Sequence, residues 1–152
     1  MDHFIGQRGR NIVFRLPTSE LDERIIDVID SWQGSLGKFG LEISTGPIVP
    51  FRARDSLATE QDVRLKRAVP LLWMQNVKPQ RVEWPVSNGK RTKSQGFLVN
   101  GKASDQLVPA ANYVLLRRFS AKEEPRRLVA APFLAADYAY QWVGLENHLN
   151  FI

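Results

Sequence analysis

The sequence predicts an α+β fold, with a mainly antiparallel or mixed twisted sheet and one longer helix near the N-terminus. An apolar stripe at helical spacing precedes roughly six to eight short apolar stretches, and no regular alternation of strands and helices connects them. Gly and Pro residues separate these stretches and favour tight turns in a partly barrel-like arrangement. A length of 152 residues fits one domain, expected over residues 1–152.

The N-terminal part of the chain predicts a strand and then the helix. Residues 9–17 form a short strand that Pro17 closes. Either Thr18 or Ser19 is expected to cap the helix, and Ser19 stands three residues before Asp22, which resembles a capping box with Asp in the Glu position. Its apolar residues recur at steps of three and four as far as Gly40 and predict one face for core packing, with a partner helix as the alternative: Leu21, Ile25, Ile29, Trp32, Leu36 and Phe39.

Strands and turns are expected to follow the helix. Residues 41–45 alternate like a strand, residues 48–51 are apolar, and residues 55–67 predict a loop or a short helix. Residues 68–77 predict a buried strand. Pro70 lacks an N–H group, which predicts that this strand lies at a sheet edge or begins at the proline.

One of these turns carries two interpretations. Ser44-Thr-Gly-Pro47 places two hydroxyl groups and a glycine close to Arg52 and Arg54. Such a loop can present backbone N–H groups to a phosphate. A tight structural turn is the more common meaning of the same residues.

The second half of the chain predicts two strand pairs. Residues 82–86 and 96–99 read as a hairpin around the turn signal Asn88-Gly89. Residues 113–119 and 126–133 read as a strand–loop–strand unit with a polar loop. Paired arginines stand at both ends of that loop, and they indicate either a solvated loop or an anionic ligand: Arg117, Arg118, Arg126 and Arg127.

Composition excludes several kinds of site. The chain has no cysteine, so disulfides and thiolate metal sites are excluded, and its two histidines, His3 and His148, lie at opposite ends. This composition suits a reducing cytoplasm, which is the expected location. No apolar run approaches the roughly 20 residues of a membrane helix, so no membrane association is expected.

Positive charge is concentrated in the middle of the chain. Residues 52–127 hold sixteen Lys/Arg and seven Asp/Glu, a net charge of +9, whereas residues 1–51 and 128–152 each carry −2. Such asymmetry points to nucleic acid or another anionic surface as the partner.

The sequence offers no catalytic arrangement of its own. It has neither the Gly-rich turn of an S-adenosylmethionine site nor a phosphate loop with lysine. His148 follows Glu146 and Asn147, which can orient its ring, but no nucleophile is identified by spacing. Glu123 and Glu124 are consecutive and flanked by basic residues, so they read as solvated or paired charges.

Five phrases spread over nearly the whole chain form a recognisable set: Ile12-Val-Phe-Arg-Leu-Pro17, Ser44-Thr-Gly-Pro-Ile-Val-Pro-Phe-Arg-Ala53, Val69-Pro-Leu-Leu-Trp-Met-Gln-Asn-Val-Lys78, Asn112-Tyr-Val-Leu-Leu-Arg-Arg-Phe-Ser-Ala-Lys-Glu-Glu124 and Gly144-Leu-Glu-Asn-His-Leu-Asn-Phe151. Together, and in this order, they resemble the carboxy-terminal region of bacterial restriction–modification adenine DNA methyltransferases. The family's catalytic phrase, Asn or Asp before Pro-Pro and an aromatic residue, is absent, so no catalytic residue is carried over.

The resemblance implies a DNA target-recognition domain, expected to be a fragment of a longer methyltransferase. Duplex DNA would be its partner, and S-adenosylmethionine would belong to a separate catalytic domain of the same parent chain, which flips adenine out of the duplex. The alternatives are the recognition domain of a fused restriction endonuclease–methylase and a non-catalytic protein-interaction module.

A recognition domain of this kind needs cations for phosphates and a few side chains for base edges. The residues expected at phosphates are Arg52, Arg54, Lys90, Arg91, Lys122, Arg126 and Arg127, with His148 and Asn147 as further backbone contacts. Those expected at bases are Gln75, Asn76, Arg117 and Arg118, and Lys78 stands beside the first two. Each has an ordinary surface or structural role as its alternative.

Overall fold

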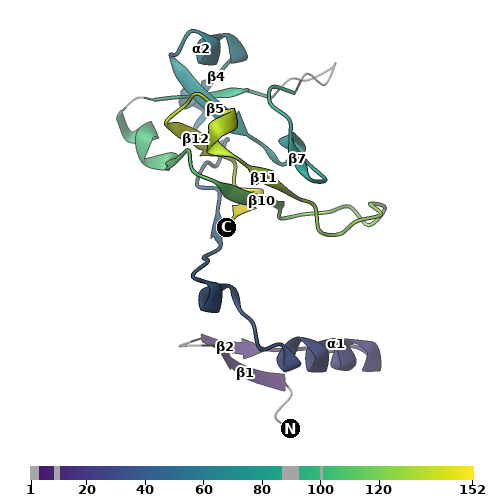
Figure 1. The fold of residues 1–152 in the computed structure, drawn as a ribbon. Helices are drawn as coiled ribbons and strands as arrows, with labels where there is room; N and C mark the ends of the chain where they lie inside the picture. The colour runs from purple at the N-terminus through teal and green to yellow at the C-terminus, as the bar shows by residue number, and fades with distance from the viewer. Residues whose placement is uncertain (1–3, 9–10, 87–92, 100) are drawn as a thin grey trace. The chain divides into compact units, whose positions relative to one another are not determined.

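The chain divides into two units, Met1–Leu41 and Glu42–Ile152. The computed structural model describes residues 4–8, 11–86, 93–99 and 101–152, and Figure 1 follows the chain through them. The predicted α+β class is confirmed, because short strands in antiparallel and mixed sheets accompany one longer helix. A single domain over residues 1–152 stays a prediction.

The first unit is a hairpin and a helix. The strands β1 (Ile5–Arg8) and β2 (Asn11–Phe14) pair antiparallel, and α1 (Glu20–Ser31) follows. Ser19 caps α1 as predicted, since its hydroxyl accepts from the Asp22 N–H at 3.2 Å. The Asp22 carboxylate accepts in turn from the Thr18 N–H and hydroxyl groups, and these hydrogen bonds lower the pKa of Asp22.

The apolar stripe of α1 is not buried. The helix ends at Ser31 with Trp32 as its C-cap, and a separate turn of 3₁₀ helix, η2 (Leu36–Phe39), begins after a break that contains Gly34. No residue of α1 is buried, and Leu21 and Trp32 are 63% and 67% exposed. The predicted core face is therefore wrong for the residues described here, because a short hairpin beside one helix has too little surface to enclose it.

The second unit contains two larger sheets and a small one. The four-stranded sheet has the order β11-β10-β13-β3, all antiparallel: β3 (Ser44–Thr45), β10 (Tyr113–Arg117), β11 (Ala130–Phe133) and β13 (Leu149–Phe151). The five-stranded sheet has the order β4-β8-β5-β12-β9: β4 (Leu57–Ala58), β5 (Ala68–Leu72), β8 (Gly96–Leu98), β9 (Leu107–Pro109) and β12 (Trp142–Leu145). The small hairpin is β6 (Val77–Lys78) with β7 (Arg81–Val82).

Short helical turns connect these strands. They are η3 (Arg54–Ser56), α2 (Glu60–Arg64), η4 (Met74–Asn76), η5 (Gly101–Gln106) and η6 (Ala135–Asp137). Thr59 and Asp62 cap α2 with a reciprocal capping box. Val63 of α2 is fully buried against Ala58 and Ala68, so this helix covers part of the five-stranded sheet.

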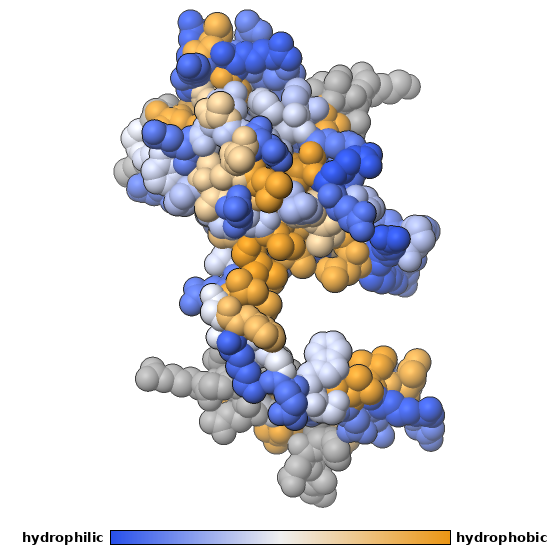
Figure 2. All heavy atoms as spheres, in the orientation of Figure 1, coloured by the Kyte–Doolittle hydropathy of each residue, from blue (hydrophilic) through white to orange (hydrophobic). Residues whose placement is uncertain are grey.

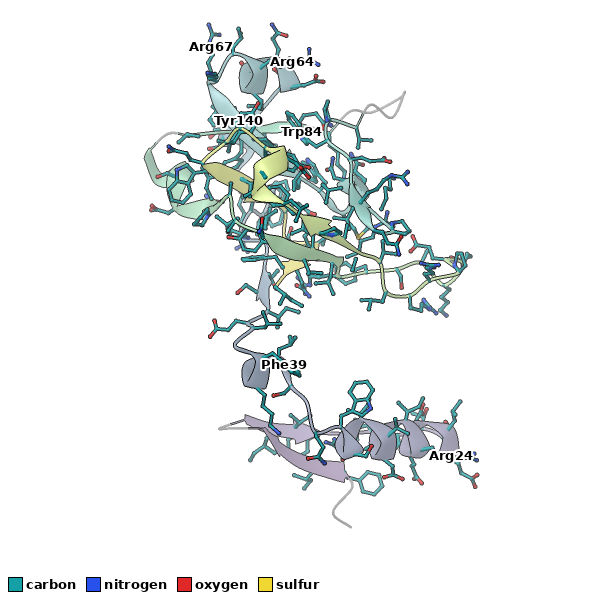
Figure 3. All side chains as sticks on the ribbon, viewed as in Figure 1. Arg24, Phe39, Arg64, Arg67, Trp84 and Tyr140 are labelled. Atoms are coloured by element: carbon teal, nitrogen blue, oxygen red, sulfur yellow. The ribbon has the colours of Figure 1, made fainter. Side chains whose placement is uncertain are left out.

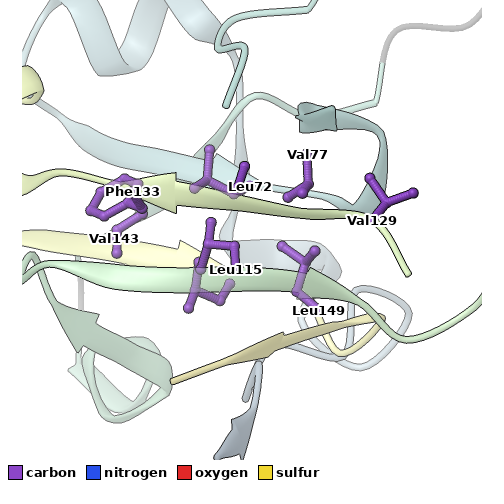
Figure 4. Close-up of a cluster of buried hydrophobic side chains, with 9 residues drawn as sticks. Leu72, Val77, Leu115, Val129, Phe133, Val143 and Leu149 are labelled. Carbon is purple, nitrogen blue, oxygen red and sulfur yellow. The ribbon is translucent and has the colours of Figure 1, made fainter. Parts of the chain in front are cut away.

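The main core joins side chains from both larger sheets. Leu115, Phe133 and Leu149 of the four-stranded sheet meet Leu72 and Val143 of the five-stranded sheet in one cluster, shown in Figure 4. Strands β10 and β11 turn alternate residues inward, as expected for a sheet with one buried face. All five residues of β5 are buried, as expected for a strand covered on both faces.

Pro70 lies in the middle of a central strand, so its predicted edge position is wrong. Strand β5 pairs with β8 on one side and with β12 on the other. The Leu71 N–H donates to the Gln95 carbonyl at 2.9 Å, which turns the nitrogen of Pro70 away from β8. Pairing with β12 begins at Leu71, so neither neighbour needs an N–H from the proline.

The predicted hairpin of residues 82–86 with 96–99 is also wrong. Strand β7 pairs with β6, and β8 pairs with β4 and β5. The buried Gln95 side chain takes the place of a ladder: its amide accepts from the Val86 N–H and donates to the Val86 carbonyl. The turn signal Asn88-Gly89 lies outside the described residues.

The strand–loop–strand prediction for residues 113–133 is confirmed, because β10 and β11 pair antiparallel. Strand β10 also pairs with β13, which follows β12 after the turn Glu146-Asn147-His148. This turn therefore carries the chain from the five-stranded to the four-stranded sheet.

Candidate nucleic-acid interface

The paired arginines at the end of β10 point to opposite faces of the sheet. Consecutive side chains alternate along a strand, and the contacts of Arg117 and Arg118 follow that rule. Arg117 Nε donates to the Val77 carbonyl of β6 at 2.8 Å, whereas Arg118 Nη1 donates to the Asn147 carbonyl of the β12–β13 turn at 2.9 Å. The two residues therefore belong to two different surfaces.

Arg117 is largely enclosed by the fold. Its side chain is 15% exposed, and Nη1 lies 3.5 Å from Glu124 Oε1 in the β10–β11 loop. A guanidinium already bonded to a carbonyl and paired with a carboxylate holds the loop against β6. This position favours a scaffold role for Arg117, and the expected base reading stays a prediction.

The β10–β11 loop and the β6–β7 hairpin form one basic surface. The Gln80 N–H between β6 and β7 donates to the Ala130 carbonyl of β11 at 3.0 Å, so the two hairpins lie against each other. Hydrophilic side chains gather over both on the right of Figure 2. We call this set the hairpin surface: Lys78, Arg81, Lys122, Arg126 and Arg127.

The side chains of the hairpin surface are poised for solvent or a ligand. Lys122, Arg126 and Arg127 are exposed in the loop. Arg127 Nη1 donates to the Ala121 carbonyl at 3.2 Å, which fixes the loop while the rest of its guanidinium stays outside. Arg81 pairs with Glu83 at 2.7 Å, so part of its charge is neutralised locally.

A second cationic group surrounds the β12–β13 turn. The guanidinium carbon of Arg118 lies 5.4 Å from the ring centre of Phe119, and the His148 ring meets the same phenylalanine edge-on at 5.3 Å. Phe119 and the His148 side chain are 53% and 47% exposed. We call Arg118, Phe119, Asn147 and His148 the turn surface.

Backbone hydrogen bonds and close packing hold the β12–β13 turn in place. The Asn147 N–H donates to the Ile48 carbonyl at 2.9 Å, and the Glu146 N–H donates to the Leu72 carbonyl at 3.0 Å. A side chain on Gly46 would bring its Cβ within 2.3 Å of the Glu146 carbonyl oxygen. The Ser44–Pro47 segment is thus a packed turn against Glu146, and the Gly46 N–H is already bonded to the Leu149 carbonyl.

Arg52 and Arg54 stand apart from both surfaces in the contacts of the described residues. Both are exposed, and the Arg52 guanidinium carbon lies 5.3 Å from the ring centre of Phe51. Lys90 and Arg91, also expected at phosphates, lie outside the described residues. The phosphate role of these four residues stays a prediction.

Asn76 has a structural position that excludes the expected base contact. The residue is fully buried, its Oδ1 accepts from the Trp73 N–H at 2.8 Å, and its Nδ2 donates to the Glu83 carbonyl at 2.7 Å. Both ends of the amide therefore serve the fold. Gln75 beside it is half-buried.

Other basic residues escaped the sequence prediction. Arg64 and Arg67 project from the α2 region, as Figure 3 shows, and Lys66 between them is exposed in a left-handed conformation with φ 59°. Lys93 Nζ lies 4.4 Å from the ring centre of Trp73. All four belong to the basic middle segment, so the charge distribution was the signal that could have included them.

Comparisons with known proteins show which proteins this chain resembles in sequence. The chain is 29% identical over 150 residues to the type II methyltransferase M.PstI of Providencia stuartii, and this match covers 99% of the chain and 29% of that protein. It is 33% identical over 118 residues to the type II methyltransferase M.BsuBI of Bacillus subtilis, covering 78% of the chain and 22% of that protein. The chain is a distant relative of type II methyltransferases.

The relationship has a defined extent. The chain spans less than a third of the length of these curated relatives. No family model matches it, and no solved structure matches it. The predicted relation to restriction–modification methyltransferases is thereby confirmed.

Among the described residues, no helix is long and apolar enough to cross a membrane. The same part of the chain holds no group of three or more His, Cys, Asp or Glu side chains arranged around a metal position.

Proposed function

We propose that this chain is the DNA target-recognition part of an adenine-specific methyltransferase of a restriction–modification system. It binds duplex DNA and presents the target adenine to a catalytic domain of the same parent chain. The observation that carries the proposal is the extent of the match: nearly all of the chain, but only 29% of the methyltransferase M.PstI, takes part in it. The basic middle segment supplies the charge that a DNA-binding part requires.

In this proposal the hairpin surface and the turn surface make different contacts with DNA. The hairpin surface contacts phosphates through Lys122, Arg126 and Arg127, because exposed cations on a loop reach a backbone without burying charge. The turn surface contacts DNA through Arg118 and His148. Arg52, Arg54, Lys78, Lys90, Arg91, Gln75 and Asn147 remain proposed contacts.

S-adenosylmethionine belongs to the catalytic domain of the parent. The sequence of this chain has no Gly-rich turn after its first strand and no Asn-Pro-Pro-aromatic phrase, so we assign none of its residues to the cofactor or to methyl transfer. The chain's part is to bind and orient the duplex.

Duplex binding measured against salt concentration tests the proposal. Fluorescence anisotropy with a labelled duplex should give an affinity that falls linearly in a double-logarithmic plot, with a slope of about −0.9 for each phosphate contacted. A flat salt response, or no binding at low salt, refutes the proposal. If unrelated polyanions compete as well as DNA and no DNA sequence is preferred, a protein-interaction module with an acidic partner is the better description.

The reading frame of the whole gene tests the remaining parts. An upstream Asn-Pro-Pro-aromatic phrase is expected, and its absence would contradict the adenine methyltransferase. A nuclease motif in the same frame would identify a fused restriction endonuclease–methylase instead of a methylase alone.

A further inference from the structure

Glu146 is a buried carboxylate in the turn between the two larger sheets. The residue is 2% exposed, and its Oε1 lies 2.7 Å from His148 Nδ1. Its other carboxylate oxygen, Oε2, is buried and has no hydrogen-bond partner among the described residues. Taking a carboxylate out of water is unfavourable unless cations or N–H donors oppose it.

The turn itself does not require an acid at this position. Backbone hydrogen bonds already close it, since the Glu146 N–H donates to the Leu72 carbonyl and the Leu149 N–H donates to the Glu146 carbonyl. An apolar side chain would fill the same space without the cost of burying a charge. The carboxylate is therefore explained by what it does to His148.

Glu146 fixes the ring of its neighbour. A hydrogen bond at Nδ1 sets the ring plane and keeps a proton on that nitrogen. The edge-on contact with Phe119, at 5.3 Å and 76°, supports the ring from a second side. Nε2 lies across the ring from the buried carboxylate, and the half-exposed side chain leaves this nitrogen for an external partner.

Arg118 belongs to the same turn surface as this ring. One of its nitrogens is held by the Asn147 carbonyl, and its backbone N–H donates to the His148 carbonyl at 3.0 Å. The remaining guanidinium donors face outward with the exposed side chain. The Arg118 guanidinium and the His148 ring thus both contact Phe119, and Glu146 is the acid that lies against His148.

We infer that Glu146 is a positioning residue for a phosphate subsite in which His148 Nε2–H and the guanidinium of Arg118 bind one DNA phosphate together. The inference rests on the proposed function. In the charged imidazolium form both ring nitrogens are donors, so Nδ1–H bonds to Glu146 while Nε2–H bonds to the phosphate. The buried carboxylate also offsets the repulsion between His148 and Arg118 when both are charged.

A double-mutant cycle on the full chain tests the subsite. His148→Ala and Arg118→Ala should each weaken two unrelated duplexes equally, by about tenfold, the loss expected for one charge-assisted hydrogen bond. Because the two side chains share one phosphate, the variant that carries both changes should reduce the salt slope by about one. Glu146→Ala should weaken DNA binding as much as His148→Ala does. The variant that carries both Glu146→Ala and His148→Ala should bind no more weakly than His148→Ala alone, because both changes remove the same contact. Additive losses would overturn the positioning role.

A conservative variant separates positioning from folding. Glu146→Gln keeps an acceptor oxygen for the His148 Nδ1–H, so it should bind DNA nearer to the unmodified chain than His148→Ala does. Nitrogen NMR of the His148 ring should show a proton on Nδ1 both in the unmodified chain and in Glu146→Gln. If Glu146→Ala does not fold, Glu146→Gln decides alone, and binding as weak as that of His148→Ala contradicts the inference.

Two controls keep the outcomes distinct. Gln141→Ala, at an exposed position before β12, should leave affinity and salt slope unchanged. A His148→Ala protein that changes sequence preference while keeping its salt slope would show a base contact and overturn the phosphate subsite. If the unmodified chain binds no duplex at all, the proposed function fails; if it binds and His148→Ala has no effect, only this inference fails.

Discussion

Replacing Asn76 by alanine removes one buried and one partly buried hydrogen bond at once. The change leaves the Trp73 N–H and the Glu83 carbonyl without their partners at 2.8 and 2.7 Å, in a place where Asn76 itself is fully buried. Each buried group left unsatisfied costs about 1–3 kcal/mol, so the expected loss of unfolding free energy is about 2–6 kcal/mol. Against a typical domain stability of roughly 5–15 kcal/mol, this is a large fraction.

Urea unfolding followed by tryptophan fluorescence measures the loss. Gln75→Ala is the matched control, because the neighbouring amide is only half-buried and is expected to cost less than about 1 kcal/mol. Asn76→Asp keeps the acceptor for the Trp73 N–H but sets a second oxygen against the Glu83 carbonyl, so it should be at least as damaging as alanine. A loss below about 1 kcal/mol for Asn76→Ala would refute the structural role. A changed DNA preference in a stable Asn76→Ala protein would restore the base-reading interpretation.

Three further outcomes are expected. Arg126→Ala with Arg127→Ala should weaken all duplexes about equally and lower the salt slope by about two, measured by anisotropy; a shift in sequence preference at constant affinity would contradict phosphate binding. Gly46→Ala should cost about 1–3 kcal/mol or more by overpacking, because its Cβ meets backbone oxygens of Glu146 and Leu145 at 2.3 and 2.7 Å, whereas Gly37→Ala meets nothing within 4 Å and serves as the control in thermal melts. The Asp62 pKa is lowered by hydrogen bonds from the Thr59 hydroxyl and N–H groups, so this stabilisation is present above the unfolded-state pKa of about 4 and disappears as pH falls through the lower folded-state pKa. Asp62→Asn should therefore lower the melting temperature near neutral pH, and an equal difference in strong acid would count against the mechanism.

Local sequence patterns predicted the elements whose signals are local. The pairing of β10 with β11 followed from two apolar stretches around a polar loop, and the start of α1 followed from Ser19 and Asp22. Such patterns do not predict which strands pair when the partners are distant in the sequence. Pro70 was wrongly expected at an edge because nothing near it reveals that pairing with β12 begins only at Leu71.

Some features of the candidate site could likewise be predicted from the sequence, and others required the structure. An asparagine at the end of a strand reads identically whether its amide faces a base or bonds to Trp73 and Glu83, so the burial of Asn76 required the structure. The placement of Arg117 and Arg118 on opposite faces of the sheet could have been predicted from the sequence, since neighbouring side chains in a strand face opposite ways. The ability of Glu146 to orient the His148 ring was predicted from its place two residues earlier, whereas its burial depends on an enclosure built from several distant segments and required the structure.

The two strands β12 and β13 also set the order in which the second unit can be assembled. Strand β12 lies between β5 and β9, and β13 lies between β10 and β3, so each of the two larger sheets has an internal gap until residues 142–151 are in place. Thr45 of β3 must wait for its partner Asn150. Contacts across such long stretches of chain slow folding. We therefore expect this unit to remain open on the ribosome, with its apolar inner faces accessible to chaperones, until β13 has left the exit tunnel.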